Sequence, residues 1–299
     1  YEGDFLADSK HGSGKCTLAD GSVYEGEYVQ ALRHGQGRQC YKNGDLYIGE
    51  WCEDVMCGKG KLHYATGDEY RGNFQFDMRH GEGEYTSKDG VSFVGTYKCD
   101  KKCGYGKALS SSGDSYAGEY RDDQRCGLGK FTWCTGDVYE GHWEADMASG
   151  RGVHVWANGD KYDGEWSGNW KVGQGRFTGN NGDEFFGEFA CDQKKCGTYK
   201  YSDGTTYVGS WKNDLKHGKG KYVMHVGDQC VTYEGEYDGD LRQGRGRYVY
   251  PDGSTYEGDW HADTRHGQGV YTWPNGSFFM GVFFVDKMDR EKGRFVVPT

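Results

Sequence analysis

The segment Tyr24–Gly44, YEGEYVQALRHGQGRQCYKNG, decides the fold. In its first five residues, aromatic and small residues alternate with acids, which is typical of a β-strand with a side-chain period of two. Gly26 leaves a gap over which the aromatic ring of a neighbouring strand can lie. We expect a turn at residues 30–34, a return strand opened by Gly35-Gln36-Gly37, where missing side chains permit tight curvature, and a two-residue turn with positive φ at Asn43-Gly44. The segment is therefore predicted to be one β-hairpin.

The same pattern recurs along the whole chain. Aromatic-x-Gly-x-aromatic begins at thirteen positions; the first nine are spaced by 23 residues, and spacings of 22, 26, 23 and 23 follow. The starts are Tyr1, Tyr24, Tyr47, Tyr70, Phe93, Tyr116, Tyr139, Tyr162, Phe185, Tyr207, Tyr233, Tyr256 and Phe279. These repeats hold 49 of the 52 glycines at equivalent positions, so chance does not explain the register. Thirteen hairpins predict an all-β fold, an elongated, single-layer antiparallel meander of about 26 strands.

The repeat unit resembles the MORN (membrane occupation and recognition nexus) family, in which Tyr-Glu-Gly-Glu-Tyr is followed by a polar turn, His-Gly-Gln-Gly and an Asn-Gly turn. The resemblance covers the whole chain and implies a twisted, solenoid-like ribbon of hairpins. We expect one continuous array over residues 1–299, irregular around 185–233 and degenerate at 279–299. The ninth repeat lacks one residue and the tenth carries three extra, so we expect a bend or bulge there. The extra residues are interpreted either as a tolerated loop insertion or as a docking feature.

Composition and charge exclude several classes of function. Gly occurs 52 times, which disfavours helix. Aromatic residues make up 16% of the chain and Pro occurs only 3 times, which disfavours disorder. The net charge of −10 argues against nucleic acid as a partner and weakens the case for an anionic membrane. The 11 cysteines, in a long chain that shows no leader, favour a reducing, intracellular location. Because the first residue is Tyr1, we expect the chain to begin inside a longer protein.

A line of His and Cys precedes the Gly-x-Gly motifs. Its members are His11, His34, Cys57, His80, Cys103, Cys126, Cys196, His217 and His266. Equivalent residues of adjacent repeats should lie roughly 10 Å apart, too far for a shared metal ion or a disulfide. Within single hairpins, Cys52/Cys57, Cys99/Cys103 and Cys191/Cys196 flank the turn. We expect free thiols there, no metal site, and no dependence of stability on chelator or reductant.

Other recurring polar residues also indicate structure rather than catalysis. Lys or Arg at the tenth repeat position follows an Asp by two residues in most repeats, as Lys10 follows Asp8, and is interpreted as a solvated, locally neutralised turn. The alternative is a basic line that meets acidic tubulin tails or lipid headgroups. Carboxylates such as Glu27 and Glu50 recur too often to form a unique acid–base pair. Gly-x-Gly lacks the context of a phosphate loop. We therefore predict no catalytic residue and no cofactor.

The last repeat departs most from the pattern. Phe278, Phe279, Phe283, Phe284 and Val285 are apolar on both strand parities, and a tail containing Phe295-Val296-Val297-Pro298 follows. Since bare apolar strand edges favour pairing, either the tail covers this end or another chain does. We predict that these five residues form a protein interface, for a homodimer or for another subunit.

The family resemblance implies a class of function. MORN arrays occur in radial spokes and other flagellar components, in protist cytoskeletal rings and in membrane–cytoskeleton tethers. The chain is accordingly expected to be no enzyme but a structural scaffold or protein–protein interaction module of the cytoskeleton or of a cilium or flagellum, such as an axonemal component. Its partners would be cytoskeletal or axonemal proteins. The alternative is a phosphoinositide-binding tether whose partner is membrane lipid.

Overall fold

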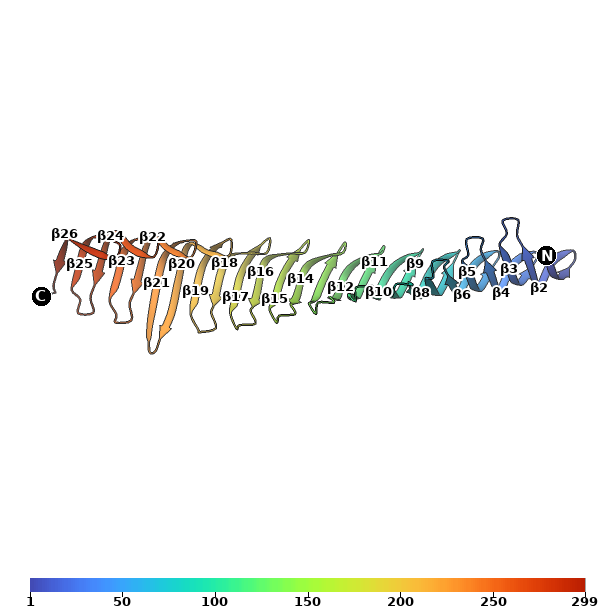
Figure 1. Cartoon of the computed structure of the whole chain (residues 1–299), viewed down its shortest axis with the longest axis horizontal. Helices are drawn as coiled ribbons and strands as arrows, with labels where there is room; N and C mark the ends of the chain where they lie inside the picture. Colours follow the sequence, from blue (N-terminus) through green and yellow to red (C-terminus); the bar gives the residue numbers. More distant parts are fainter. Residues whose placement is uncertain (299) are drawn as a thin grey trace. The chain divides into compact units, whose positions relative to one another are not determined.

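A computed structural model describes residues 1–298 of the chain, and every regular element in that range is a β-strand (Figure 1). The chain divides into two compact units, Tyr1–Ala148 and a second that begins at Ser149. The first unit contains β1 (Glu2–Leu6), β2 (Ser9–Thr17), β3 (Val23–Val29), β4 (Leu32–Cys40), β5 (Leu46–Cys52), β6 (Val55–His63), β7 (Glu69–Gln75), β8 (Met78–Thr86), β9 (Ser92–Lys98), β10 (Lys101–Leu109), β11 (Ser115–Arg121), β12 (Gln124–Thr132) and β13 (Val138–Glu144). No helix in residues 1–298 is long and apolar enough to cross a membrane.

The second unit continues the same alternation of strands. After β14 (Met147–Val155), which begins just before the boundary, it contains β15 (Lys161–Ser167), β16 (Trp170–Thr178), β17 (Glu184–Ala190), β18 (Gln193–Lys200), β19 (Thr206–Lys212), β20 (Leu215–Val226), β21 (Gln229–Asp238), β22 (Leu241–Val249), β23 (Thr255–His261), β24 (Thr264–Thr272), β25 (Phe278–Phe284) and β26 (Lys287–Val296). Within each unit, every strand pairs antiparallel with the next one along the chain. Each unit is thus an open meander of hairpins, as the repeat predicts.

The two turns of a repeat have different conformations. Within most hairpins, two residues that are not glycine adopt positive φ, as Gln30 (φ 50°) and Ala31 (φ 66°) do. Between hairpins, a glycine such as Gly44 has positive φ (94°), and its N–H donates to the carbonyl oxygen of Tyr41 at 3.0 Å. The predicted positive φ at Gly44 is confirmed, but Asn43 does not share it, and the turn has three residues between Tyr41 and Asp45, whose backbones are bonded at 2.9 Å, so the predicted two-residue length is wrong.

Aromatic rings pack against the glycine backbone. A Cβ atom added to Gly37 would lie 2.2–2.5 Å from atoms of the Tyr24 ring, and one added to Gly26 would be 2.5 Å from the Tyr24 hydroxyl oxygen. Tyr24 also meets Trp51 of the following repeat edge to face, with ring centroids 5.3 Å apart. Because such contacts recur from repeat to repeat, they form a core one ring thick.

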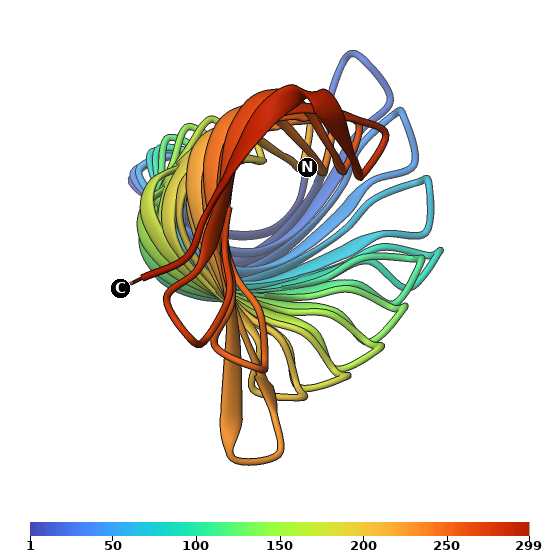
Figure 2. The same ribbon diagram turned by 90° about the vertical axis from the view of Figure 1, so that its left-hand side faces the viewer.

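Side-chain alternation gives each unit two faces. We call the face that carries the buried aromatic rings, such as Tyr24 and Trp51, the ring face. The opposite face carries residues of the other parity, such as Glu25 and Glu27, and we call it the groove face. In Figure 2, successive hairpins within each unit are rotated relative to one another, which is the twist expected of β-strands.

The two irregular repeats differ less from the others than their sequences indicate. In the ninth repeat, the strand pairing shifts between Glu188 and Phe189, close to where other hairpins have their bulge. In the tenth, β20 and β21 stay in register as far as Val226 opposite Gln229, so the extra residues only lengthen the hairpin. This hairpin, orange in Figure 2, extends beyond its neighbours in the second unit. The expectation of a bend or bulge at the insertion is therefore wrong.

Candidate protein-interaction surfaces

The recurring carboxylates of the groove face bind backbone N–H groups. Glu27 accepts a hydrogen bond from the N–H of Gln36 at 3.0 Å, and Glu50 accepts one from Lys59 at 3.0 Å. The same contact is made by Asp4 to Ser13, Glu119 to Leu128, Glu165 to Gln174 and Asp259 to Gln268. These N–H groups lie at the bulge that opens each return strand, where no strand partner is available to them. The carboxylates therefore stabilise the repeat.

The basic residues at the tenth repeat position join adjacent repeats. Arg33 donates from Nε to the Asp54 carboxylate at 3.0 Å, and its guanidinium lies 4.1 Å from the centre of the Trp51 ring. Asp54 also accepts the backbone N–H of Arg33 at 2.9 Å. The same pairing joins Arg79 to Asp100, Arg125 to Asp146, Arg242 to Asp263 and Arg265 to Asp286. The interpretation as solvated turns, each neutralised by the Asp two residues before, is wrong: the ion pair spans 21 residues and covers aromatic rings.

The His and Cys line forms no cluster suited to a metal. Among residues 1–298, no three His, Cys, Asp or Glu side chains lie close enough together to hold an ion. Cys52 and Cys57 form a disulfide across the β5–β6 turn, so the expectation of free thiols is wrong for this pair. The reason is local, since the turn brings the Cα atoms to 5.9 Å, within disulfide range. The matching pairs Cys99/Cys103 and Cys191/Cys196 are free thiols.

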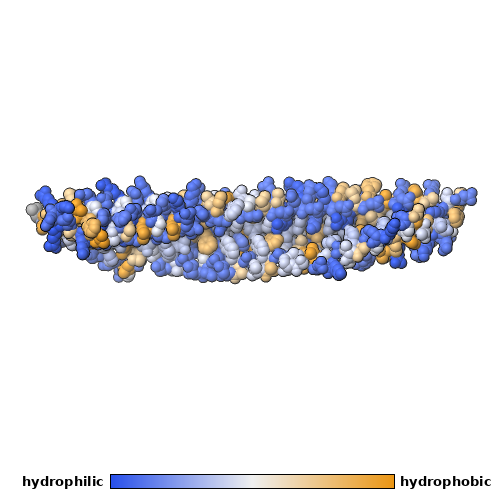
Figure 3. Space-filling view, turned by 45° about the horizontal axis from the view of Figure 1, so that its top comes forward, coloured by the Kyte–Doolittle hydropathy of each residue, from blue (hydrophilic) through white to orange (hydrophobic). Residues whose placement is uncertain are grey.

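The last repeat separates the five predicted interface residues by parity. Phe279 and Phe283 point to the ring face and are buried, with Phe283 packed against Tyr256 at a centroid distance of 4.9 Å. Phe284 and Val285 are 65% and 51% exposed. Phe278, on the groove face with Phe284, is partly exposed. In the space-filling view of Figure 3, hydrophilic side chains predominate, and apolar ones form scattered patches.

The first residues of the tail, Phe295 and Val296, belong to β26, the return strand of this repeat. β26 pairs with β25, and Phe295 lies against Phe279 at a centroid distance of 4.9 Å. Phe295 also stacks on Trp273, with the ring planes 23° apart. The tail thus covers the ring of Phe279, while Phe284 and Val285 stay exposed.

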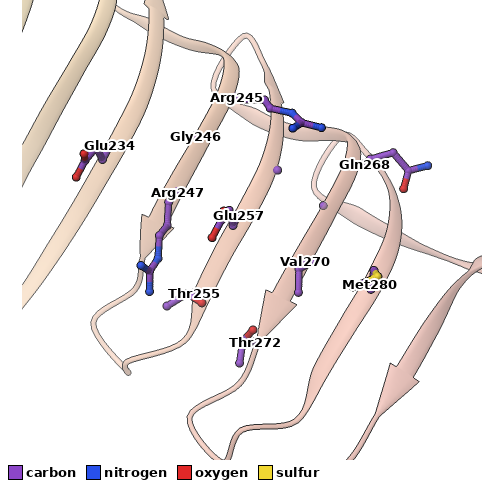
Figure 4. Close-up of a pocket in the computed structure, with 12 residues that line it drawn as sticks. Glu234, Arg245, Gly246, Arg247, Thr255, Glu257, Gln268, Val270, Thr272 and Met280 are labelled. Atoms are coloured by element: carbon purple, nitrogen blue, oxygen red, sulfur yellow. The ribbon is translucent and has the colours of Figure 1, made fainter.

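A groove lies on the groove face of the second unit, and the sequence alone did not reveal it. It has a volume of about 1110 Å³ and crosses strands β21–β25 (Figure 4). Its polar lining includes Glu234, Arg245, Arg247 and Glu257, and its apolar lining includes Met280. A smaller hollow of about 490 Å³ continues it toward β19 and shares two of these residues. The sequence does contain a signal for this groove. In each repeat, the residue that follows the first aromatic points to the groove face, because side chains alternate along a strand.

Comparison with known proteins agrees with the repeat. The model of the MORN repeat matches eleven stretches, residues 1–23, 24–46, 47–69, 70–92, 93–115, 116–138, 139–161, 162–184, 207–229, 233–255 and 256–278. The ninth and last repeats, whose glycine motifs are altered, lie outside these stretches. No curated protein matches the chain.

Several solved structures match the chain at low identity and with low TM-scores. The TCP domain of Drosophila melanogaster SAS-4 (dCPAP), in complex with a proline-rich motif of Ana2, is 12% identical, with a TM-score of 0.34 over 59% of this chain and 90% of that one. The TCP10 domain of Danio rerio CPAP with a STIL peptide is 12% identical, with a TM-score of 0.23 over 96% and 98%. Such scores carry no functional argument. The repeat matches cover most of the sequence, and the chain belongs to the MORN repeat family.

Proposed function

We propose that this chain is a non-enzymatic scaffold that binds proteins of the cytoskeleton or of a cilium or flagellum, such as the axoneme or its radial spokes. The observation that supports it most is how the recurring polar side chains are used. Carboxylates such as Glu27 bind bulge N–H groups, and guanidinium groups such as that of Arg33 join adjacent repeats. The same contacts recur in many repeats and stabilise each of them, whereas catalysis needs one unique arrangement of side chains.

The exposed apolar residues of the last repeat are the proposed contact with partner proteins. Phe284 and Val285 lie on the surface, and Phe278 adds a partly exposed ring on the same strand. Burying a side chain of this kind contributes about 1.5–3 kcal/mol to association. Either a second copy of this chain or another scaffold subunit would cover them.

Detergent extraction tests the proposal. The tagged full chain is expressed in ciliated cells, membranes are removed with detergent, and the fraction of the protein that stays with the cytoskeleton is measured. We expect most of it to remain. A parallel arm measures sedimentation of the purified chain with vesicles that contain phosphoinositides. Loss of the protein with the membranes, together with vesicle binding, would replace the scaffold by the phosphoinositide-binding tether.

A further inference from the structure

Apolar side chains flank the turns of the first three hairpins, strands β1–β6, which are drawn in shades of blue in Figure 1. Val29 and Leu32 lie opposite each other beside the turn of the second hairpin and are 40% and 39% exposed. Leu6 has the place of Val29 in the first hairpin and is 60% exposed. Val55 has the place of Leu32 in the third hairpin and is half-buried. We call these four residues the apolar rim of the first unit.

The apolar rim lies on one face of the sheet. Val29 is two residues beyond Glu27 on β3, so its side chain points to the groove face. Leu32 points to the same face because it lies opposite Val29. The same alternation places Leu6 and Val55 there. Equivalent residues of successive hairpins are two strands apart, about 9.6 Å, so the rim is about 19 Å long.

The repeat does not itself require apolar side chains at these positions. In the fourth hairpin, Gln75 has the place of Val29. In the fifth, Lys98 lies opposite Lys101 beside an equivalent turn. Because the turns form with polar and charged residues as well, the fold does not account for the apolar rim.

Carboxylates surround the apolar rim. Asp8 and Glu53 lie in the turns themselves, and within residues 1–298 neither forms an ion pair. Glu27 and Glu50 lie on the groove face close to the turns, where they accept backbone N–H groups and keep their negative charge. A partner at the rim would therefore meet apolar surface bordered by negative charge.

Most cations of these hairpins lie elsewhere. The basic residues of strands β1–β6 are Lys10, Lys15, Arg33, Arg38, Lys59 and Lys61. Lys10 and Arg33 lie over aromatic rings on the ring face. Three of the others lie at the ends of the return strands farther from the turns, where Glu25 and Glu69 oppose them. Only Lys59 of this set is left near the rim, so negative charge predominates there.

The backbone of the turns is already bonded, which favours a helical partner over an added strand. The N–H of Ala31 donates to the carbonyl oxygen of Lys10 at 2.9 Å, and that of Asp54 donates to Arg33 at 3.0 Å. A partner that adds a strand needs a free row of backbone groups, whereas a helix satisfies its own backbone and binds through side chains. A heptad of a helix rises about 10.5 Å, close to the spacing of about 9.6 Å between hairpins.

We propose that the apolar rim binds a basic amphipathic helix of a partner protein. The apolar stripe of the helix lies along the rim, and its Lys and Arg side chains lie near Asp8, Glu27, Glu50 and Glu53. The proposal rests on the scaffold function and names the chemistry of one partner. At about 1.5 Å per residue, about 13 residues of helix span the rim. Anionic lipid headgroups do not suit this surface, because the same carboxylates repel them.

Fluorescence anisotropy with defined peptides tests the proposal on the purified full chain. The probe is a labelled helical peptide of about 18 residues, with Leu in one stripe and Lys on the remaining faces. One comparison peptide has the same composition in scrambled order, and another carries Glu for Lys. We expect the probe to bind, less tightly in added salt, the scrambled peptide to bind at least roughly tenfold more weakly, and the Glu peptide not to bind. Equal affinity for the probe and the scrambled peptide would overturn the proposal.

Substitutions in the rim locate the site. We expect V29S with L32S to weaken binding of the probe by at least roughly tenfold. The matched control, V94S with L128S, removes the same two residue types where they are 50% and 57% exposed elsewhere in the first unit, and should bind as the wild type does. Equal binding by the two double variants, each with the circular dichroism of the wild type, would contradict the assignment.

A charge reversal tests the site without changing the rim itself. Glu53 lies in the turn of the third hairpin, and we expect E53K to weaken binding of the probe by roughly fivefold. The matched control is E140K, at an exposed position of the seventh hairpin, and should lower the affinity by less than roughly twofold. An equal loss in both variants would mean that the peptide senses only the overall charge, and would overturn the proposal.

Failure here is distinguishable from failure of the scaffold function. Peptide binding is measured without cells, whereas the scaffold function is measured as retention on the cytoskeleton. If V29S with L32S binds the probe normally but the chain stays on extracted cytoskeletons, only the assignment of the rim is wrong. If the peptide results hold and retention is lost, the scaffold function is wrong while the rim remains a helix-binding site.

Discussion

At the scale of single residues, Arg33 is predicted to stabilise the fold through its contacts with the next repeat. Arg33→Ala removes the hydrogen bond to Asp54 and the contact with the Trp51 ring, so we expect a loss of about 1–3 kcal/mol in the free energy of unfolding. Arg38→Ala is the control, because Arg38 lies on the same strand, is exposed and has no ion pair within residues 1–298. Urea denaturation measures both. Equal effects of the two substitutions would mean that the Arg33 contacts do not stabilise the fold.

The buried tyrosines set a limit to stability at high pH. Burial raises the pKa of Tyr24 and Tyr70 to about 12. Because the unfolded value is about 10, the neutral hydroxyls stabilise the fold fully below about pH 10, and this contribution is lost as the pH rises through about 12. We expect unfolding, measured by circular dichroism, to coincide with tyrosinate absorbance in that window. Full ionisation of these tyrosines in a chain that remains folded would contradict the packing described.

At the scale of the strand, the tenth and twelfth repeats offer a matched pair of tryptophans. Trp260 donates from Nε1 to the carbonyl oxygen of Gly246 at 3.1 Å. Trp211 holds the equivalent position, but its indole N–H is buried and has no partner in the described chain. Both substitutions replace an indole by a phenyl ring, but only Trp260→Phe breaks a hydrogen bond. Trp260→Phe should therefore lower the free energy of unfolding by about 1 kcal/mol more than Trp211→Phe does. Thermal unfolding of both variants checks this, and equal costs would count against it.

Periodicity alone predicted the strands, and it did so because glycine and aromatic residues recur at fixed spacing. The turns were harder to predict. Gln30 and Ala31 adopt positive φ although neither is Gly or Asn, because the twist of the flanking strands selects that turn. The Arg33–Asp54 pair was missed for a related reason. Its partners are 21 residues apart in sequence, and only the strand register brings them together.

The sequence predicted the burial of the five proposed interface residues only in part. Alternation along β25 correctly singles out an apolar strand, but the aromatic positions Phe279 and Phe283 are used by the repeat itself. The groove could not be predicted, because a bulge at each Gly-x-Gly shifts the register of the return strand. The sequence does not give the position of this bulge, so it could not show that Arg245 and Arg247 lie on the same face as Glu257.

At the scale of the whole molecule, each repeat is stabilised chiefly by the next. Tyr24 packs on Trp51, and Arg33 binds Asp54, both in the following repeat. Stability in such an array behaves as a sum of contacts between nearest neighbours. In the last repeat, β26 is the return strand that pairs with β25, and Phe284 and Val285 stay exposed. We predict that these two residues contact another protein.

The measurement that tests the scaffold account most directly compares two variants of the full chain. Phe278→Ser with Phe284→Ser removes apolar groups from the last repeat, while Phe76→Ser removes a ring that is 68% exposed in a turn of the first unit. Mass in solution is measured by light scattering, and captured proteins are identified from detergent-extracted cytoskeletons. We predict that the double variant loses captured partners, or the second copy of the chain, and that Phe76→Ser loses neither. If the double variant keeps the mass and the partners of the wild type, the last repeat is no interface and the tail simply ends the sheet.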